Sequence, residues 1–223
     1  MLPSLLLFSL INYSLATWYY GVDFSDSTTV TQLSCFKKSN YYSLLPRVFH
    51  AGEVDQNGIQ TMKTIREQGI LINAYGYITP SMDDGELQIN KLYNALISND
   101  IIGRTFYLKV TQSSAPWTTN STFNVNLINT MITRGSQCGL IISIHTSYSD
   151  WVAITSNVNA LVTHAGLWYS NVFGPGVTGE SQQNYDDFVA FGPFSKSSVV
   201  RKQFAITENV CGLNVNRNVY WIG

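Results

Sequence analysis

Short strand-like runs alternate with longer stretches of helical periodicity along most of this 223-residue sequence, and this alternation constrains the fold most. The run from Tyr19 to Phe24 is rich in aromatic residues, which favour strands. Apolar Val30, Leu33 and Phe36 follow it at a spacing typical of one helix face. The same order recurs with strands predicted near residues 47–50, 70–75, 106–110 and 140–144 and helices near 59–66, 87–97, 125–132 and 151–158. Five strand–helix units of this kind predict a mainly parallel sheet.

The last part of the sequence follows a different pattern. Leu167–Tyr169 is a further strand candidate, and a segment rich in Gly, Pro, Ser and Gln follows at residues 171–185. Beyond it, β-like runs recur without an amphipathic helix between them, near 188–191, 199–206 and 219–222. We therefore expect an α/β fold, a short, incomplete barrel of mainly parallel strands with a β-rich tail rather than an open doubly wound sheet. Glycines after the periodic residues predict that two of the helices end at Gly69 and Gly135.

The first 16 residues contain no charged side chain and carry an apolar run from Leu5 to Ile11. With Ser14-Leu15-Ala16 behind it, this run is typical of a secretory signal peptide cleaved after Ala16, the alternative being a buried N-terminal strand. No later segment approaches the twenty or so uninterrupted apolar residues that a membrane-spanning helix needs. We therefore expect residues 17–223 to form one secreted domain.

An exported chain meets an oxidising environment, which favours disulfide bonds. Cys35, Cys138 and Cys211 allow three different single bridges, among which the sequence does not choose. Their wide spacing excludes a compact Cys-x-x-Cys metal site. Asn120-Ser121-Thr122 is an N-glycosylation sequon in a polar stretch, so a secreted chain could carry a glycan at Asn120.

The charge balance limits the class of partner. The chain has 13 basic and 14 acidic side chains and a net charge of -1, which provides no field to hold a nucleic acid or an anionic membrane. Charged residues make up only 12% of the chain, whereas aromatic residues make up 13%, so the surface is neutral and rich in hydroxyl groups. Neither a glycine-rich phosphate-binding motif nor histidines at metal-ligand spacing are present, so we expect no cofactor and no metal.

Function is expected where the barrel strands end, because the loops after parallel strands form the binding face of such folds. Aromatic and hydroxylated side chains dominate these positions, and such surfaces bind sugars through ring faces and hydrogen bonds. The candidate sugar platforms, each of which could instead be an ordinary core aromatic, are Tyr75, Tyr77, Trp117, Tyr148, Trp151 and Trp168. The other side chains predicted at the mouth are Asp23, Ser25, Glu53, Asp55, Lys109, Thr111, His145, Tyr169 and Glu208.

Hydrolysis of a glycosidic bond requires two carboxyl groups flanking that bond, one protonated and one ionised. Asp23 and Glu53 follow the first two predicted strands and are the acids that the strand pattern brings together. The acidic pairs at 83–84 and 186–187 are expected in a solvated turn and a surface loop. The candidate acid pair is therefore Asp23 with Glu53.

Several short motifs occur in order along the chain. They are Tyr20-Gly21-Val22-Asp23-Phe24-Ser25, residues 69–80 with Ala74-Tyr75-Gly76-Tyr77, Phe106–Val110, Gly166–Tyr169, and Lys202-Gln203-Phe204 before Cys211–Asn216. Together they resemble the secreted lysozymes of glycoside hydrolase family 25, and most of all their nematode and amoebic branch. The resemblance implies a flattened α/β barrel of five βα units closed by three further strands, and muramidase action on bacterial peptidoglycan. It also implies a role in innate antibacterial defence or in the digestion of bacteria.

Most of the acids that the resemblance leads us to expect are replaced. Asp23 is retained, whereas Lys109 and Thr111 occupy the positions of the family's Asp-x-Glu, and Asn214 occupies that of a later Asp. The transition state resembles an oxocarbenium ion, which a Lys about 5 Å away repels by roughly 3 kcal/mol at an effective dielectric of 20. A Thr hydroxyl binds its proton too tightly to replace the proton donor.

We therefore expect a lysozyme-like protein that recognises peptidoglycan or a related glycan, with catalysis lost or strongly reduced. Two alternatives stay open. One is a working muramidase in which Asp23 acts with Glu53 or with an acetamido group of the substrate. The other is a secreted scaffold whose cleft no longer binds sugar.

Overall fold

A computed structural model describes residues 17–69, 73–101 and 103–222. The predicted signal peptide lies outside these residues, as does the start of the predicted strand at 70–75. The strands are β1 (Thr17–Phe24), β2 (Tyr41–His50), β3 (Glu53–Val54), β4 (Asn73–Ala74), β5 (Gly76–Thr79), β6 (Thr105–Lys109), β7 (Ile141–Thr146), β8 (Leu167–Ser170), β9 (Val199–Val210) and β10 (Leu213–Ile222). The helices are α1 (Val30–Lys38), α2 (Gln56–Glu67), α3 (Gly85–Ser98), α4 (Ser121–Gln137) and α5 (Tyr148–Thr155), with short 3-10 turns at Val177–Gly179 and Lys196–Ser198.

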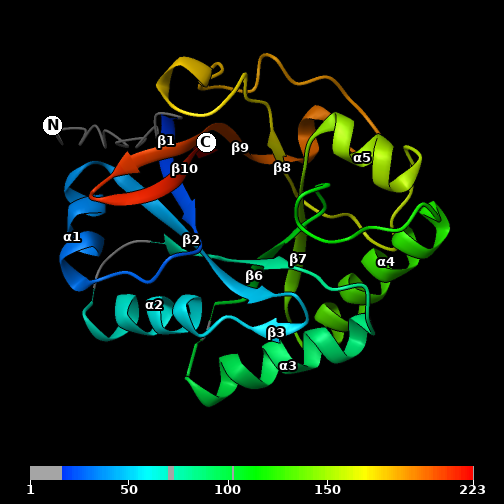
Figure 1. The fold of residues 1–223 in the computed structure, drawn as a ribbon, viewed down its shortest axis with the longest axis horizontal. Coiled ribbons are helices and arrows are strands. Elements are labelled where there is room, and N and C mark those ends of the chain that lie inside the picture. The colour runs from blue at the N-terminus through cyan, green and yellow to red at the C-terminus, as the bar shows by residue number, and fades with distance from the viewer. Residues whose placement is uncertain (1–16, 70–72, 102, 223) are drawn as a thin grey trace, which may run out of the picture.

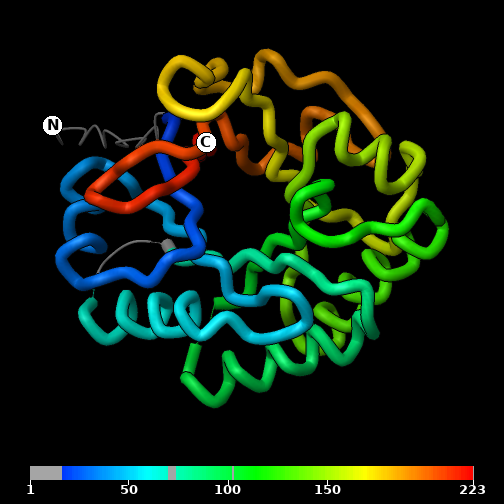
Figure 2. Tube along the Cα trace, in the orientation of Figure 1, coloured from blue at the N-terminus to red at the C-terminus, as the bar shows by residue number. Residues whose placement is uncertain are grey.

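The strands close into a barrel (Figure 1). Parallel pairing runs from β1 through β2, β5, β6, β7 and β8 to β9. β10 lies antiparallel between β9 and β1 and completes the ring, so the barrel is closed rather than incomplete. The predicted five βα units and three further strands are confirmed, with β8, β9 and β10 as the closing strands. The Cα trace shows the C-terminal hairpin beside the first strand (Figure 2).

Local signals explain where the helices begin and end. Each α-helix follows a residue whose side chain caps its first turn, and these residues are Thr29, Asp55, Asp84, Asn120 and Ser147. Gly69 follows α2 with a left-handed φ of 57°, as predicted. The predicted end at Gly135 is wrong, because α4 continues to Gln137. Gly135 serves packing instead, since a Cβ there would lie 2.4 Å from Ile142 Cγ1.

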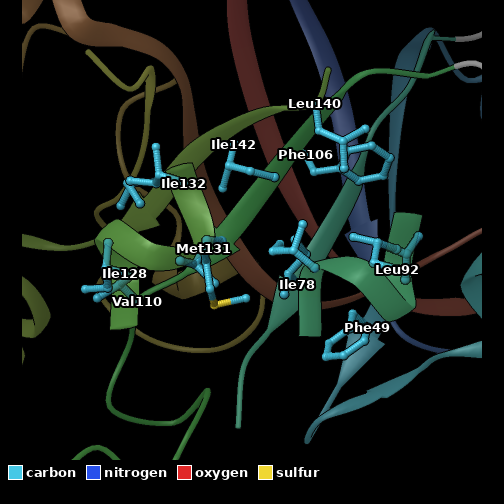
Figure 3. Close-up of a cluster of buried hydrophobic side chains, with 14 of the residues drawn as sticks. Phe49, Ile78, Leu92, Phe106, Val110, Ile128, Met131, Ile132, Leu140 and Ile142 are labelled. Carbon is cyan, nitrogen blue, oxygen red and sulfur yellow. The ribbon is translucent and has the colours of Figure 1, made fainter. Parts of the chain in front are cut away.

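The main hydrophobic core lies between the barrel wall and the helices (Figure 3). Ile78 of β5 and Phe106 of β6 pack there with Leu92 of α3 and Met131 of α4. A separate core that includes Val22 lies under α1. Because successive strand residues point to opposite faces, the alternate residues of each strand point into the barrel. Those interior residues build the candidate site.

The C-terminal part differs from the sequence prediction in detail. β9 and β10 extend beyond the runs at 199–206 and 219–222, because the two strands pair with each other as a long hairpin. The run near 188–191 is not a strand, since Phe191 forms only an isolated bridge with Phe194. These aromatic rings pack on the main core instead.

One of the three possible cysteine pairings is present. Cys35 of α1 and Cys211, in the turn between β9 and β10, form a disulfide, whereas Cys138 is free. The bond joins α1 to the closing hairpin of the barrel. Within the described part of the chain, the helices are too short or too polar to cross a membrane.

Candidate active site

A cavity of about 380 Å³ opens at the carboxyl ends of the barrel strands, and we call it the mouth cavity. This is the end of the barrel at which folds of this kind bind their ligands. Of the residues predicted at the mouth, Tyr77, Lys109, Thr111 and His145 line it. The other lining residues are Thr79, Ser113, Ser114, Asp150, Ser170, Val172, Gln203, Ile206, Thr207 and Asn216.

Three of the lining residues, together with Asn218 beneath them, hold the carboxylate of Asp23, which is fully buried. Asp23 Oδ2 accepts hydrogen bonds from Asn216 Nδ2 at 2.9 Å and from Lys109 Nζ at 3.1 Å. Asp23 Oδ1 accepts from Gln203 Nε2 and Asn218 Nδ2, each at 2.9 Å. A carboxylate has about four lone-pair sites, so these four donors fill them.

The Asp23 carboxylate is held in its ionised form. Burial by itself raises the pKa of Asp23, but the charge of Lys109 and the amides of Asn218 and Asn216 lower it, and the resulting pKa lies below the ordinary 3.8. The Lys109 side chain is 14% exposed, and its Nζ lies 4.1 Å from the ring centroid of Tyr77. The positive member of the pair therefore faces the mouth cavity, and the negative member is enclosed.

His145 is the second titratable group at this position. Burial and then the charge of Lys109 lower the pKa of His145 to about 3, so its ring is neutral near pH 7. His145 Nδ1 lies 3.0 Å from the backbone oxygen of Trp168, which makes Nδ1 the donor and leaves Nε2 as an acceptor. A neutral imidazole of this kind can accept a hydrogen bond from a sugar hydroxyl. Within the described residues, no group of three or more His, Cys, Asp or Glu is placed to hold a metal ion.

The loop after β6 is fastened by two side chains. Trp117 Nε1 donates to the backbone oxygen of Thr111 at 2.8 Å, and its half-buried ring packs on the main core. Asp150 Oδ1 accepts from the backbone N–H of Gln112 at 2.9 Å, and its Oδ2 accepts from Ser147 Oγ at 2.7 Å. Trp117 and Asp150 thus hold Thr111 at the edge of the mouth cavity.

The predicted sugar platforms occupy different environments. Trp151 and Trp168 are fully buried, and Trp168 packs against Tyr77 inside the barrel. Tyr75 is half-buried and lies two residues before Tyr77 on the chain, toward the amino ends of the parallel strands. Tyr77 is 5% exposed but lines the mouth cavity, and Tyr148 is 60% exposed. Tyr77 and Tyr148 are thus the best-placed of these rings to meet a ligand.

A second hollow of about 420 Å³ adjoins the mouth cavity and shares Ser170 with it; we call it the aromatic groove. Its polar side is held by Asp187, which accepts from the Tyr169 hydroxyl and the Asn171 amide and pairs with the buried Lys202. Its other lining residues are Ser147, Tyr148, Ser149, Phe188, Val189 and Phe191. Aromatic rings beside hydrogen-bonding side chains form the kind of surface that binds a sugar.

Glu53 and Asn214 lie apart from the hydrogen-bond network around Asp23. Glu53 is in β3, its side chain is 74% exposed, and it pairs with Lys91 of α3. Asn214 is exposed in the closing hairpin, opposite Asn209. Among the described residues, the side chains that hydrogen-bond to Asp23 come from neither position.

Sequence reasoning missed Gln203, Asn216, Asn218 and Asp150. Asn216 and Asn218 alternate along β10, and alternation places residues on one face of a strand. The alternation predicts that Asn216 and Asn218 share one face of β10, but it does not predict that this face contacts Asp23. That contact depends on the register in which β10 pairs with β1, where Asn216 lies opposite Asp23.

The closed barrel of five βα units and three further strands has the fold class of the family 25 muramidases. The structure of a family GH25 lysozyme from Aspergillus fumigatus matches with a TM-score of 0.65 and 13% identity over 92% of this chain and 94% of that chain. The modular autolysin LytC from Streptococcus pneumoniae, in complex with synthetic peptidoglycan ligand, matches with a TM-score of 0.65 and 13% identity over 92% of this chain and 47% of that chain.

Sequence comparison gives the family within this class. The family described as Lysozyme-like protein 1 matches residues 14–204. Lysozyme-like protein 1 of Caenorhabditis elegans is 42% identical over 212 residues, which are 93% of this chain and 70% of that protein. The chain belongs to this lysozyme-like family, and the predicted kinship with family 25 lysozymes and their nematode branch is confirmed.

Proposed function

We propose that this lysozyme-like protein is secreted and binds the glycan of bacterial peptidoglycan in its barrel mouth, with hydrolysis lost or strongly reduced. The ion pair between Lys109 and Asp23 carries the proposal. It puts a positive charge at the place where cleavage of a glycosidic bond needs accessible negative charge.

The chemistry of the lining residues supports the loss of hydrolysis. Cleavage builds positive charge on the sugar ring and requires a proton donor for the leaving oxygen. Lys109 repels that charge, and the Asp23 carboxylate behind it has its acceptor sites filled. Thr111 cannot donate a proton near neutral pH, and loss of a general acid alone costs about 100- to 10,000-fold in rate. The remaining carboxylate among the described lining residues, Asp150, is engaged in fastening the loop after β6.

The same surface keeps what sugar binding needs. Neutral His145 offers an acceptor, and the polar residues Thr79 and Ser170 also line the mouth cavity. The aromatic groove continues this surface from Ser170 to the exposed ring of Tyr148. A glycan strand can therefore extend from the mouth cavity into the aromatic groove.

Retention on insoluble peptidoglycan tests binding. We expect the mature protein to sediment with purified cell walls, and Tyr148→Ala to weaken retention about fivefold, since a stacked ring contributes about 1 kcal/mol. Tyr42→Ala is the matched control, because Tyr42 is an exposed tyrosine near the start of β2, at the opposite end of the barrel. A wild-type protein that stays in the supernatant would contradict glycan binding, and equal losses in both variants would contradict binding along the aromatic groove.

A turbidity assay on bacterial cell walls tests hydrolysis. We expect the wild-type protein to clear the suspension no faster than Asp23→Asn does. Clearing by the wild-type protein that Asp23→Asn abolishes would identify a working muramidase and overturn the proposal of lost catalysis.

Export is the second part of the proposal, and it is supported by the pattern of residues 1–16. Asn120 is exposed at the start of α4, and its Oδ1 accepts from the Phe123 N–H, which leaves Nδ2 as the atom to carry a glycan. Mass spectrometry of protein secreted by eukaryotic cells should find Thr17 as the first residue and a mass that falls on treatment with peptide N-glycosidase. An intact Met1 would contradict cleavage, and an unchanged mass would contradict the glycan. The kinship with lysozymes extends the proposal to a role in innate antibacterial defence or in digestion of bacteria.

A further inference from the structure

A charged side chain lies in the barrel interior below the Asp23 network. Arg201 precedes Gln203 by two residues on β9, so both side chains point inward and Arg201 lies deeper. Arg201 is 3% exposed. Its Nε and Nη1 have no hydrogen-bond partner among the described residues.

Aromatic rings and a glycine surround this guanidinium. The Arg201 Cζ lies 4.5 Å from the ring centroid of Tyr220 and 5.5 Å from that of Tyr75. A Cβ placed on Gly21 would lie 2.8 Å from Arg201 Nη1 and 3.1 Å from Ser43 Cβ. Glycine at position 21 therefore lets the guanidinium approach Ser43, whose fully buried Oγ also has no partner in the described chain.

The neighbouring acid does not compensate this charge. Asp23 already accepts four hydrogen bonds, one of them from Lys109, and the ion pairs of the described residues do not include Arg201. Trp168, the register partner of Arg201 on β8, adds a buried Nε1 donor without an acceptor. Buried charges in proteins are normally paired, and ring faces offset only part of the desolvation of a cation.

We propose that the barrel floor binds a small monovalent anion, chloride under physiological conditions. The anion accepts hydrogen bonds from Arg201 Nε and Nη1 and from Ser43 Oγ, and it neutralises the guanidinium. The rings of Tyr75 and Tyr220 lie beside the guanidinium and flank the anion. This site is separate from the mouth cavity and stabilises the barrel irrespective of whether the mouth binds a glycan.

A crystal grown with sodium bromide tests the site directly, because bromide replaces chloride and gives an anomalous signal. We expect an anomalous peak within about 3.5 Å of Arg201 Nε or Nη1. A water molecule bridging these atoms, with no anomalous peak, would overturn the proposal.

Thermal unfolding supplies a second readout in solution. At constant ionic strength, replacing sodium gluconate by sodium chloride should raise the Tm of the wild-type protein by about 3 °C or more for each tenfold increase of chloride above its Kd. Arg201→Met, which keeps an unbranched apolar stem but removes the guanidinium and its charge, should remove this dependence. Arg104→Met, at an exposed arginine, should retain it.

If Arg201→Met does not fold, Ser43→Ala takes its place and should shift the chloride dependence to higher concentrations. Equal Tm values of the wild-type protein in chloride and in gluconate would count against an anion site, as would the same chloride response in Arg201→Met and Arg104→Met.

Discussion

Lys109 Nζ and Asp23 Oδ2 lie 3.1 Å apart at the barrel mouth, although the two residues are 86 positions apart in the sequence. Lys109 ends β6 and Asp23 lies near the end of β1, so the closure of the barrel brings the charges together. The Asp23 side chain has no exposed surface, whereas that of Lys109 is partly exposed. A ligand in the mouth cavity would therefore contact the ammonium group and not the carboxylate. This relationship underlies both the stability of the mouth and its proposed lack of hydrolysis.

Removing one member of this pair should destabilise the fold, because the other charge is left buried or half-buried. We expect Lys109→Met to lower the free energy of unfolding by about 3 kcal/mol, measured by denaturant titration. The double variant Asp23→Asn/Lys109→Met should cost less than the sum of the two single variants, since it leaves no unpaired charge. Strict additivity would show that the two side chains do not interact.

The pH dependence of stability should report His145. Its pKa is lowered from 6.5 to about 3, so between these pH values the unfolded chain binds a proton that the folded chain does not. The free energy of unfolding should therefore rise with pH across this window, by up to about 1.4 kcal/mol per pH unit, and level off above it. His145→Gln should flatten the slope, whereas His164→Gln, at an exposed histidine, should keep it. An unchanged slope in His145→Gln would contradict a buried neutral ring.

The disulfide should contribute strongly to stability, because Cys35 and Cys211 are 176 positions apart and their bond closes a long loop of the unfolded chain. Cys211→Ser should lower the free energy of unfolding by about 3–5 kcal/mol under oxidising conditions. Cys138→Ser is the control, and it should change stability by less than about 1 kcal/mol because Cys138 forms no disulfide. Equal losses in the two variants would contradict this pairing.

The contact of α2 with β2 depends on one glycine. A Cβ on Gly58 would lie 1.7 Å from the backbone oxygen of Arg47, so any side chain would push the helix off the barrel wall. We expect Gly58→Ala to lower the free energy of unfolding by about 3 kcal/mol. Gln60→Ala, at an exposed position of the same helix, should stay within about 0.5 kcal/mol of the wild-type protein. Wild-type stability of Gly58→Ala would show that the helix lies farther from the strand.

The positions of the strands and helices follow from local patterns, and the sequence predicts them well. The apolar spacing of Val30, Leu33 and Phe36 predicts α1, and Gly69 marks the end of α2, because periodicity and capping act within a few residues. Gly135 misleads for a physical reason, since a glycine that ends a helix and one that permits close packing look the same in sequence.

The order of strands also places Asp23, Lys109, Thr111 and His145 at the barrel mouth, because parallel strands end at the same edge. The order of strands does not reveal which amides donate hydrogen bonds to the Asp23 carboxylate. Gln203, Asn216 and Asn218 are 180, 193 and 195 positions from it, and only the pairing that closes the barrel brings them within hydrogen-bond distance. Local periodicity therefore specifies the elements of this protein, whereas the state of its charged groups is decided by which strands become neighbours, since hydrogen bonds and burial depend on contacts that no short stretch of sequence contains.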